Sequence, residues 1–278
     1  MGLKINNKNI SEITFLFITY NRPQLLARAL HALNNVSLEI GISPYLIVSD
    51  DGSTPENLDL LYRLNFDEVL TTDKNSGLGA NQNKGLARCF TQYILQIQDD
   101  WIFTGNPNDL SRAIEIMNSD PTIGVLQLTK TNSDLPVNFK KFGSSCYKIF
   151  ANDGLPWNRN CSVRPYSDNP HLKRRDFVLD VGPYLEGVPM TICENDFKKR
   201  VATQNKWKIA EFCCDPMFEH LGADVSMNSG GNPHKILRLI KKIPFVGNLL
   251  VFIIRRLYYI IDNKLVLVLF YIKKINDK

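Results

Sequence analysis

Three short polar runs stand out because each follows an apolar run and carries residue types that bind nucleotides and cations. They are Thr19-Tyr20-Asn21-Arg22, Asp50-Asp51-Gly52-Ser53-Thr54 and Gln98-Asp99-Asp100. Carboxylates near a strand end accept hydrogen bonds from the base and ribose hydroxyls of a nucleotide, which is the role we expect for Asp50 and Asp51. Adjacent carboxylates can also hold Mg²⁺ or Mn²⁺ against the oxygens of a diphosphate, and Asp99 and Asp100 suit that role.

A fourth polar segment, residues 75–85, lies between these runs and contains Asn75, Gly77, Asn83 and Gly85. It predicts a glycine-containing turn into a helix, whose free N–H groups can face a bound nucleotide. Each segment taken singly is also typical of ordinary turns and helix caps. Their order within one α/β pattern favours a common ligand site.

The segments around these runs alternate between strand-like and helix-like patterns. We expect strands at 13–20, 45–49, 68–71 and 93–98, and helices at 22–33, from a cap at Ser53 or Thr54 to residue 64, and at 78–90. This alternation predicts a mainly parallel sheet covered by helices on both faces, with ligands at the carboxyl ends of the strands.

The periodicity weakens beyond residue 105. We expect a helix at 109–118, a strand at 123–129, irregular chain at 133–169, a helix at 194–204 and a strand at 206–212. Residues 1–234 are thus predicted to form one domain, with a nucleotide-binding half at about 11–104 and an acceptor half at about 105–234.

The C-terminal segment has a different charge from the rest of the chain. Residues 235–278 hold ten bases and two acids, whereas the remainder holds 23 bases and 26 acids. Apolar runs separate these bases, and none reaches the roughly 18–20 residues that a membrane-spanning helix needs. We predict basic amphipathic helices on an anionic membrane surface, the alternative being packing on the body or on a second subunit. Nucleic acid is not expected as a partner, because long Leu/Ile/Val runs are untypical of nucleic-acid binders.

Cysteine usage and the N-terminal residues predict a location. Six cysteines occur without a Cys-x-x-Cys pair, which favours a reducing compartment, and residues 1–11 lack the pattern of a secretory signal. We expect a cytoplasmic protein that is peripherally associated with the cytoplasmic face of the membrane.

With these motifs in order, residues 13–101 resemble the nucleotide-binding half of a GT-A-fold glycosyltransferase of family 2. The resemblance implies inverting transfer of a sugar from a nucleotide diphosphate donor, with uracil the favoured base and with Mg²⁺ or Mn²⁺ held by an Asp-x-Asp motif. The residues that would contact the nucleotide sugar are Thr19, Tyr20, Asn21, Arg22, Asp50, Asp51, Asn75, Gly77, Asn83 and Asp99.

The metal motif departs from the family pattern, because Gln98 stands at the position of the first acid. The resemblance makes Asp100 the first candidate for a metal ligand, and Asp99 a contact of ribose or metal. It also makes His220 a candidate ligand of metal or phosphate.

Inverting transfer needs a base that takes the proton of the acceptor hydroxyl. Glu194-Asn195-Asp196, expected at the start of a helix, resembles the acidic motif that supplies this base in the family. The usual adjacent acids are separated here by Asn195, so we favour Asp196 and keep Glu194 as the second candidate. The alternative is an acidic helix start stabilised by the helix dipole.

The sequence is therefore interpreted as a glycosyltransferase acting on a glycan or lipid-linked acceptor, in the assembly of surface polysaccharide or lipopolysaccharide. Gln98 and the separated acids leave open a catalytically silent sugar-nucleotide binder or membrane scaffold. A nucleotidyltransferase is a weaker alternative, because the Gly-rich basic loop that such enzymes carry after the first strand is replaced by Thr19-Tyr20-Asn21-Arg22.

Overall fold

The computed structural model of the protein describes residues 13–130, 137–150, 166–213 and 215–221. The chain divides into one unit of residues 1–221 and a second of residues 222–278. The second unit lies outside the described residues, so the helices predicted for residues 235–278 stay a prediction. Within the described ranges, no helix is long and apolar enough to cross a membrane.

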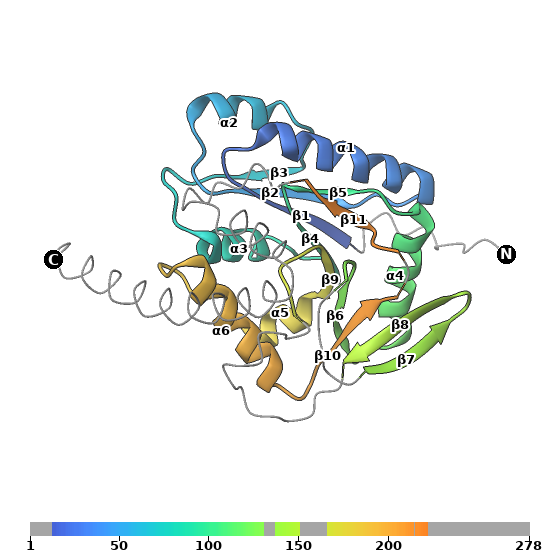
Figure 1. Ribbon diagram of the computed structural model, residues 1–278. Helices are drawn as coiled ribbons and strands as arrows, with labels where there is room; N and C mark the ends of the chain where they lie inside the picture. Colours follow the sequence, from blue (N-terminus) through green and yellow to red (C-terminus); the bar gives the residue numbers. More distant parts are fainter. Residues whose placement is uncertain (1–12, 131–136, 151–165, 214, 222–278) are drawn as a thin grey trace, which may run out of the picture. The chain divides into compact units, whose positions relative to one another are not determined.

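A nine-stranded sheet forms the centre of the described structure, in the order β3-β2-β1-β4-β9-β6-β10-β8-β7 (Figure 1). Its strands are β1 (Ile13–Thr19), β2 (Tyr45–Asp50), β3 (Glu68–Leu70), β4 (Tyr93–Gln98), β6 (Ile123–Gln127), β7 (Val137–Phe142), β8 (Ser145–Phe150), β9 (His171–Arg174) and β10 (Lys208–Phe212). All of them except β8 and β9 run in the same direction. The prediction of a mixed, mainly parallel sheet is confirmed.

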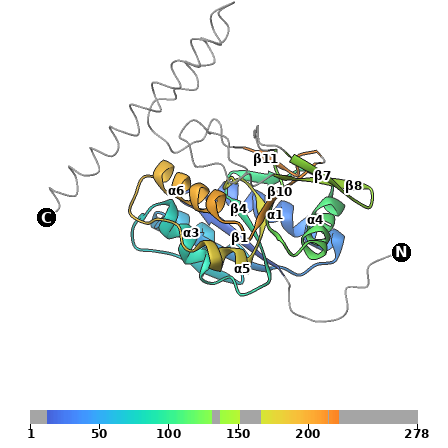
Figure 2. The same cartoon turned by 90° about the horizontal axis from the view of Figure 1, so that it is seen from below.

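Helices cover both faces of this sheet (Figures 1 and 2). One face carries α1 (Pro23–Ile40), α2 (Pro55–Tyr62) and α4 (Pro107–Ser119), and the other carries α3 (Leu78–Leu86), α5 (Arg175–Val181) and α6 (Met190–Thr203). Side chains alternate along a strand, so Phe15 and Phe17 of β1 join the core under α1, while Leu16 and Ile18 join the core under α3 and α6. Packing on both faces therefore holds β1, β2 and β4 in place, and the polar runs follow directly at the ends of these strands.

Helix α1 extends well beyond its predicted end at residue 33. Pro23 occupies its first turn, and Leu26, Leu30 and Leu33 face the core as expected. Val36 is also buried and continues the same apolar stripe, so packing keeps the helix going to Ile40.

The prediction of irregular chain at 133–169 is wrong for residues 137–150. Strands β7 and β8 form an antiparallel hairpin there, with Gly143 in the left-handed conformation at φ 57°. Because β7 is an edge strand whose central residues are exposed, it carries Lys140 and Lys141 instead of an apolar run. The sequence therefore lacks the apolar pattern by which a strand would be predicted here.

Strand β9 and helix α5 were also not predicted. Strand β9 lies antiparallel between β4 and β6, and all four of its residues are buried. Three of the four are the polar residues His171, Lys173 and Arg174, so the sequence lacks the apolar pattern that is typical of a central strand. Arg174 is satisfied because it donates hydrogen bonds to the carbonyls of Ile123 at 2.8 Å and Asp120 at 3.1 Å.

A short two-stranded ribbon stands apart from the main sheet. It pairs β5 (Trp101–Phe103) with β11 (Phe218–His220), antiparallel, and sets His220 opposite Trp101. Neither of these three-residue strands was predicted. The ribbon returns the chain to the end of β4.

Helix α6 begins at Met190, four residues before its predicted start, so Glu194 and Asp196 lie in its second turn. The expectation that these acids open the helix is therefore wrong. The N-terminal part of α6 lies against the start of α3. A Cβ on Gly79 would lie 2.0 Å from the Leu185 carbonyl oxygen and 3.0 Å from Cys193 Sγ.

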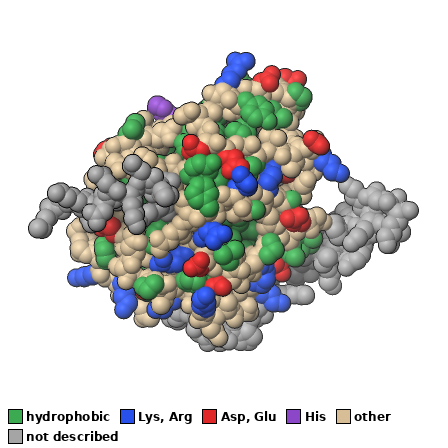
Figure 3. Space-filling view, turned by 180° about the vertical axis from the view of Figure 1, so that it is seen from behind, with side chains coloured by type: hydrophobic (Ala, Val, Ile, Leu, Met, Phe, Trp, Pro, Cys, Tyr) green, Lys and Arg blue, Asp and Glu red, His purple; other side chains and the backbone are tan. Residues whose placement is uncertain are grey.

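No one type of side chain dominates the face of the described structure that is seen from behind (Figure 3). Figure 3 shows basic and acidic side chains mixed with hydrophobic ones across this face of the described structure. The chemistry of the molecule is concentrated at the strand ends.

Candidate functional site

Two pairs of carboxylates lie buried at the carboxyl ends of β2 and β4. The exposed fractions are 0% for Asp50, 4% for Asp51, 4% for Asp99 and 8% for Asp100. Because β1 lies between β2 and β4 and runs parallel to both, the sheet brings the two pairs and Thr19 to one edge. Buried carboxylates are costly unless they are paired or hydrogen-bonded, so their partners define the site.

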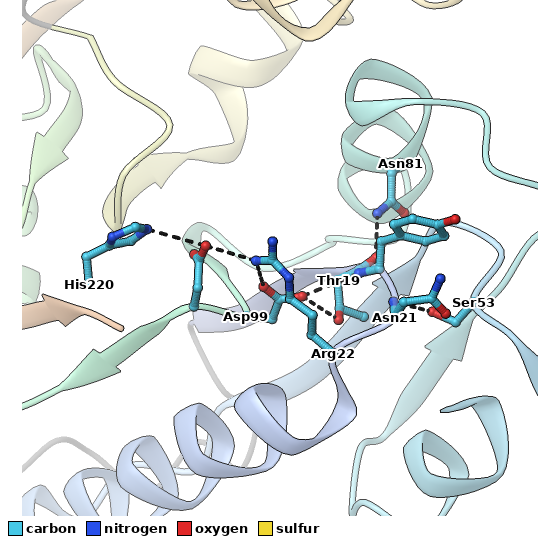
Figure 4. Close-up of polar contacts among 9 residues, drawn as sticks. Thr19, Asn21, Arg22, Ser53, Asn81, Asp99 and His220 are labelled. Atoms are coloured by element: carbon cyan, nitrogen blue, oxygen red, sulfur yellow. Dashed lines mark hydrogen bonds and ion pairs between the residues drawn. The ribbon is translucent and has the colours of Figure 1, made fainter. Parts of the chain in front are cut away.

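Asp50 shapes the loop that follows β2. Its carboxylate accepts a hydrogen bond from the Ser53 N–H at 2.8 Å and another from the Ser53 hydroxyl. The same hydroxyl oxygen accepts from the Asn21 N–H at 2.7 Å. Asn21 adopts the left-handed conformation at φ 55°, and its Oδ1 accepts from the Thr54 N–H at 2.8 Å. The loops after β1 and β2 are thereby joined (Figure 4).

Asp51 holds the turn that precedes α3. Its two carboxylate oxygens accept hydrogen bonds from the N–H groups of Ser76 at 2.8 Å and Gly77 at 3.0 Å. Burial raises the pKa of Asp51, while these two N–H groups act in the opposite direction. Gly52 is required beside this turn, because it has φ 74° and a Cβ there would lie 2.6 Å from the backbone carbon of Lys74.

A cavity of about 380 Å³ opens beside Asp51 and is large enough for part of a small ligand such as a nucleoside. Its lining includes Asp51, Ser76, Asn81, Asn83, Lys84 and Glu186. Asn83 also fixes the far wall, since its amide group donates to the Tyr184 carbonyl at 2.9 Å and to Glu186 Oε1 at 2.7 Å. The cavity wall thus combines carboxylates, amides and one lysine. Asn75 is exposed in the turn next to it.

Asp99 is bound on all sides at the end of β4. Its Oδ2 accepts from the Thr19 hydroxyl at 2.8 Å and from the Tyr20 N–H at 3.4 Å, and its Oδ1 lies 3.2 Å from Arg22 Nη1. Burial raises the pKa of Asp99 to about 6, and the Thr19 hydroxyl and the Arg22 guanidinium limit the rise. Figure 4 shows Thr19, Arg22 and Asp99 converging at this point.

Asp100 is less completely bound. Its Oδ2 lies 3.0 Å from Arg22 Nη1 and 3.3 Å from His220 Nε2. Its Oδ1 is buried and has no hydrogen-bond partner among the residues that the structure describes. His220 reaches this point because β11 returns to pair with β5 and because the Leu221 N–H bonds to the Asp100 carbonyl at 2.8 Å.

These groups fit a divalent cation that takes part of its ligands from the protein. In the described part of the chain, no cluster of three His, Cys, Asp or Glu side chains suited to a metal ion occurs. The buried Oδ1 of Asp100, which is unpaired among the described residues, and the nearby His220 are nevertheless available as ligands. Mg²⁺ in proteins is commonly bound by one or two carboxylates, together with water and substrate phosphates.

The two acids of α6 have different surroundings. Asp196 forms an ion pair with Arg200 at 2.8 Å, and Arg200 also donates to the carbonyls of Val181, Gly182 and Pro183. Glu194 lies 3.2 Å from Lys198, and burial raises the pKa of its carboxyl. Asp196 is therefore part of a structural link between α5 and α6, whereas the partner of Glu194 within the described residues is the flexible side chain of Lys198.

The sequence did not single out several residues that build the site. Ser53 or Thr54 was expected as a helix cap; Thr54 takes the N-cap position of α2, and Ser53 instead bonds to Asp50. Asn81 accepts from the Ser49 hydroxyl at 2.8 Å and donates to the Thr19 carbonyl at 3.1 Å. Asn81 could have been found from the sequence as a polar residue on the face of a short helix that is expected to be buried. Lys84, which donates to the Asp50 carbonyl, carried no such signal.

Comparisons with known proteins agree with this architecture. The family model described as "Glycosyl transferase family 2" matches residues 14–166, more than half of the chain. No curated protein sequence matches. Similar solved structures include the mannosyltransferase PcManGT of Pyrobaculum calidifontis in complex with GDP-Man and Mn²⁺, with a TM-score of 0.56 and 13% identity over 83% of this chain and 61% of that one. Residues 1–349 of S. aureus TarS give a TM-score of 0.51 and 17% identity over 84% of this chain and 66% of that one.

The same part of TarS in complex with UDP gives a TM-score of 0.52 and 16% identity over 82% of this chain and 63% of that one. This chain thus spans less than two thirds of the length of these three structures. At such identities the likeness establishes the fold.

Replacing Ser53 tests whether the buried carboxylates depend on their loop partners. Ser53→Ala leaves an oxygen of Asp50 and the N–H of Asn21 without the shared hydroxyl, so we expect the free energy of unfolding to fall by about 1–3 kcal/mol in urea denaturation. Thr54→Ala is the matched control, because Thr54 is exposed and its side chain makes no capping hydrogen bond. It should cost about 0.5 kcal/mol or less. Equal losses in the two variants would contradict the role of Ser53.

Proposed function

Since the chain belongs to glycosyl transferase family 2, we propose that it moves a sugar from a nucleoside diphosphate to a hydroxyl of a glycan or lipid-linked acceptor, with inversion at the anomeric carbon. The chain is a glycosyltransferase, and UDP is the carrier we favour. The observation that carries the proposal is the convergence of two buried carboxylate pairs on one sheet edge, where one oxygen of Asp100 has no partner among the described residues.

The cavity beside Asp51 supports a nucleoside subsite. It offers carboxylate, amide and ammonium groups next to the backbone of the turn before α3. Thr19, Tyr20 and Asp99 lie at the neighbouring strand end, on the route from that cavity to Asp100 along the sheet edge. The solved structure of the mannosyltransferase is a complex with GDP-Man and Mn²⁺, and TarS has been crystallised with UDP. We therefore assign Asn75, Gly77 and Asn83 to the nucleoside side, and Arg22, Asp99 and Asp100 to the diphosphate side.

Mg²⁺ or Mn²⁺ is the cofactor we assign to Asp100 and His220. When bound, such a cation neutralises charge on the diphosphate as it leaves. The protein supplies the Asp100 carboxylate, whose Oδ2 lies 3.0 Å from Arg22, and holds His220 on the β5–β11 ribbon at 3.3 Å from the same oxygen.

Glu194 is the general base that the contacts support. In the proposed step its carboxylate takes the proton of the acceptor hydroxyl, and the acceptor oxygen bonds to the anomeric carbon. The bond from that carbon to the diphosphate oxygen breaks, and attack from the opposite side inverts the centre. Asp196 is held in an ion pair with Arg200, so it is better suited to positioning α6. The raised pKa of Glu194 brings it closer to the value that a general base needs near neutral pH.

The sequence of residues 235–278 supports an acceptor at a membrane. Its ten bases lie between apolar runs, a composition that suits the headgroup region of an anionic leaflet. An enzyme held there meets lipid-linked acceptors at a raised effective concentration. Assembly of surface polysaccharide or lipopolysaccharide at the cytoplasmic face is the role we propose.

Donor turnover by the full chain tests the proposed function. We expect UDP release from one or more UDP-sugars in the presence of Mn²⁺, with GDP-sugars assayed in parallel, and a loss of about 100-fold or more in Asp100→Asn. Asp59→Asn, on the exposed surface of α2, is the charge-matched control and should keep the wild-type rate. Folded wild-type protein that turns over no nucleotide sugar, or an Asp100→Asn variant as active as Asp59→Asn, would contradict the proposal.

The assignment of the base predicts different outcomes for the two acids of α6. Glu194→Gln should lower the rate of sugar transfer by about 100-fold or more, because the proton acceptor is lost. Asp196→Asn should keep the rate within about tenfold.

The wild-type rate should also depend on pH. Because the pKa of Glu194 is raised above 4.5, kcat/KM should fall on acidification already at a pH above that value, as the carboxylate becomes protonated. An inactive Asp196→Asn beside an active Glu194→Gln would reverse the assignment.

A further inference from the structure

Arg22 lies between the two carboxylates of the proposed cation site. Its Nη1 is 3.2 Å from Asp99 Oδ1 and 3.0 Å from Asp100 Oδ2. The three side chains are 15%, 6% and 12% exposed, respectively, so the guanidinium is largely shielded from water. One guanidinium of the chain itself is therefore shared by both carboxylates before any ligand binds.

The two acids depend on Arg22 to different degrees. Asp99 keeps the Thr19 hydroxyl and the Tyr20 N–H as donors if the guanidinium leaves. Asp100 has Arg22 and His220 as its side-chain partners within the described structure. A divalent cation at Asp100 would lie close to a positive guanidinium in a poorly hydrated place, where like charges repel strongly. Arg22 therefore weakens the binding of a divalent cation to Asp100.

The guanidinium also has unused hydrogen-bonding capacity. Arg22 Nε is buried, and the part of the chain that the structure describes gives it no acceptor. A diphosphate beside Asp100 offers several anionic oxygens, and a guanidinium binds such oxygens through two parallel N–H groups. An incoming diphosphate is therefore a competing partner for the same side chain.

We propose that Arg22 is the resident counter-ion of Asp100 and couples cation binding to donor binding. Without donor, the guanidinium occupies Asp100 and weakens the site for a divalent cation. With donor, the diphosphate draws the guanidinium away, and Asp100 becomes free for the cation. This inference rests on the proposed function, because it takes the donor to be a nucleoside diphosphate sugar.

Such coupling is reciprocal. If the diphosphate raises the affinity for the cation by some factor, the cation raises the affinity for the diphosphate by the same factor. Arg22 therefore disfavours a cation bound without donor, and it makes the two ligands bind as a pair.

Mn²⁺ binding to the full chain tests the proposal without turnover. Free Mn²⁺ is measured by electron paramagnetic resonance in titrations of the protein with Mn²⁺ alone, with UDP added and with GDP added. For wild type we expect weak binding of Mn²⁺ alone and affinity raised about tenfold or more by one of the nucleotides. Arg22→Gln should bind Mn²⁺ alone about tenfold more tightly than wild type, and the nucleotide should add less.

Arg28→Gln is the matched control, because it removes the same charge from an exposed position on α1. It should behave as wild type, which separates a local effect at Asp100 from a general change of net charge. Arg22→Lys keeps the charge on a different head group and should give an intermediate affinity for Mn²⁺ alone. It supplies the test if Arg22→Gln fails to fold in a thermal melt.

The proposal is overturned if the Arg22 variants bind Mn²⁺ alone no more tightly than Arg28→Gln. It is also overturned if neither nucleotide changes the affinity of wild type, or if Mn²⁺ binds to no form of the protein. Donor turnover by wild type in either of the first two cases would leave the proposed function standing, and turnover without any Mn²⁺ binding would remove the assigned cofactor as well. Absence of turnover together with tighter Mn²⁺ binding by Arg22→Gln would instead retain the coupling of Arg22 to the cation and remove the function.

Discussion

The structure of the site depends on one electrostatic constraint, the burial of four carboxylates at two neighbouring strand ends. Asp50, Asp51, Asp99 and Asp100 are each at most 8% exposed. Burying an ionised group without partners costs several kcal/mol, so the surrounding loops must supply donors. The loop after β2 serves Asp50, the turn before α3 serves Asp51, and the end of β1 serves Asp99. Asp100 keeps one buried oxygen without a partner in the described structure, and that oxygen is where we place the cation.

The rest of the fold keeps these groups together. Parallel pairing of β1 with β2 and β4 aligns the two acid pairs, since the carboxyl ends of these strands share one edge of the sheet. The β5–β11 ribbon then brings a residue from the end of the described chain to the same edge. Close approach of α6 to Gly79 sets the helix that carries Glu194 beside α3, whose preceding turn binds Asp51. The donor side and the proposed base thus belong to one packed unit.

The first half of the fold could be predicted because its strands are apolar runs that end in polar motifs. Strand β4 was predicted with its observed bounds, and the acids that follow β2 and β4 lie together as expected. Strand β9 could not be predicted, because Lys173 and Arg174 interrupt its apolar pattern and only the tertiary structure shows that both are buried. Likewise, the sequence does not reveal the hydrogen bond between Ser53 and Asp50 or the ion pair between Arg200 and Asp196, because both depend on the folded positions of these side chains. Sequence patterns report burial and turns, but they do not report which partner a buried charge finds.

The most direct test of the central claim is to locate the cation by anomalous scattering in crystals of the full chain grown with UDP and Mn²⁺. The account predicts a manganese peak beside Asp100, with Arg22 turned from Asp100 towards the phosphates. Bound UDP with manganese elsewhere, or with Arg22 still on Asp100 and no metal present, would contradict the account. In that case the unpaired oxygen of Asp100 would need a different explanation.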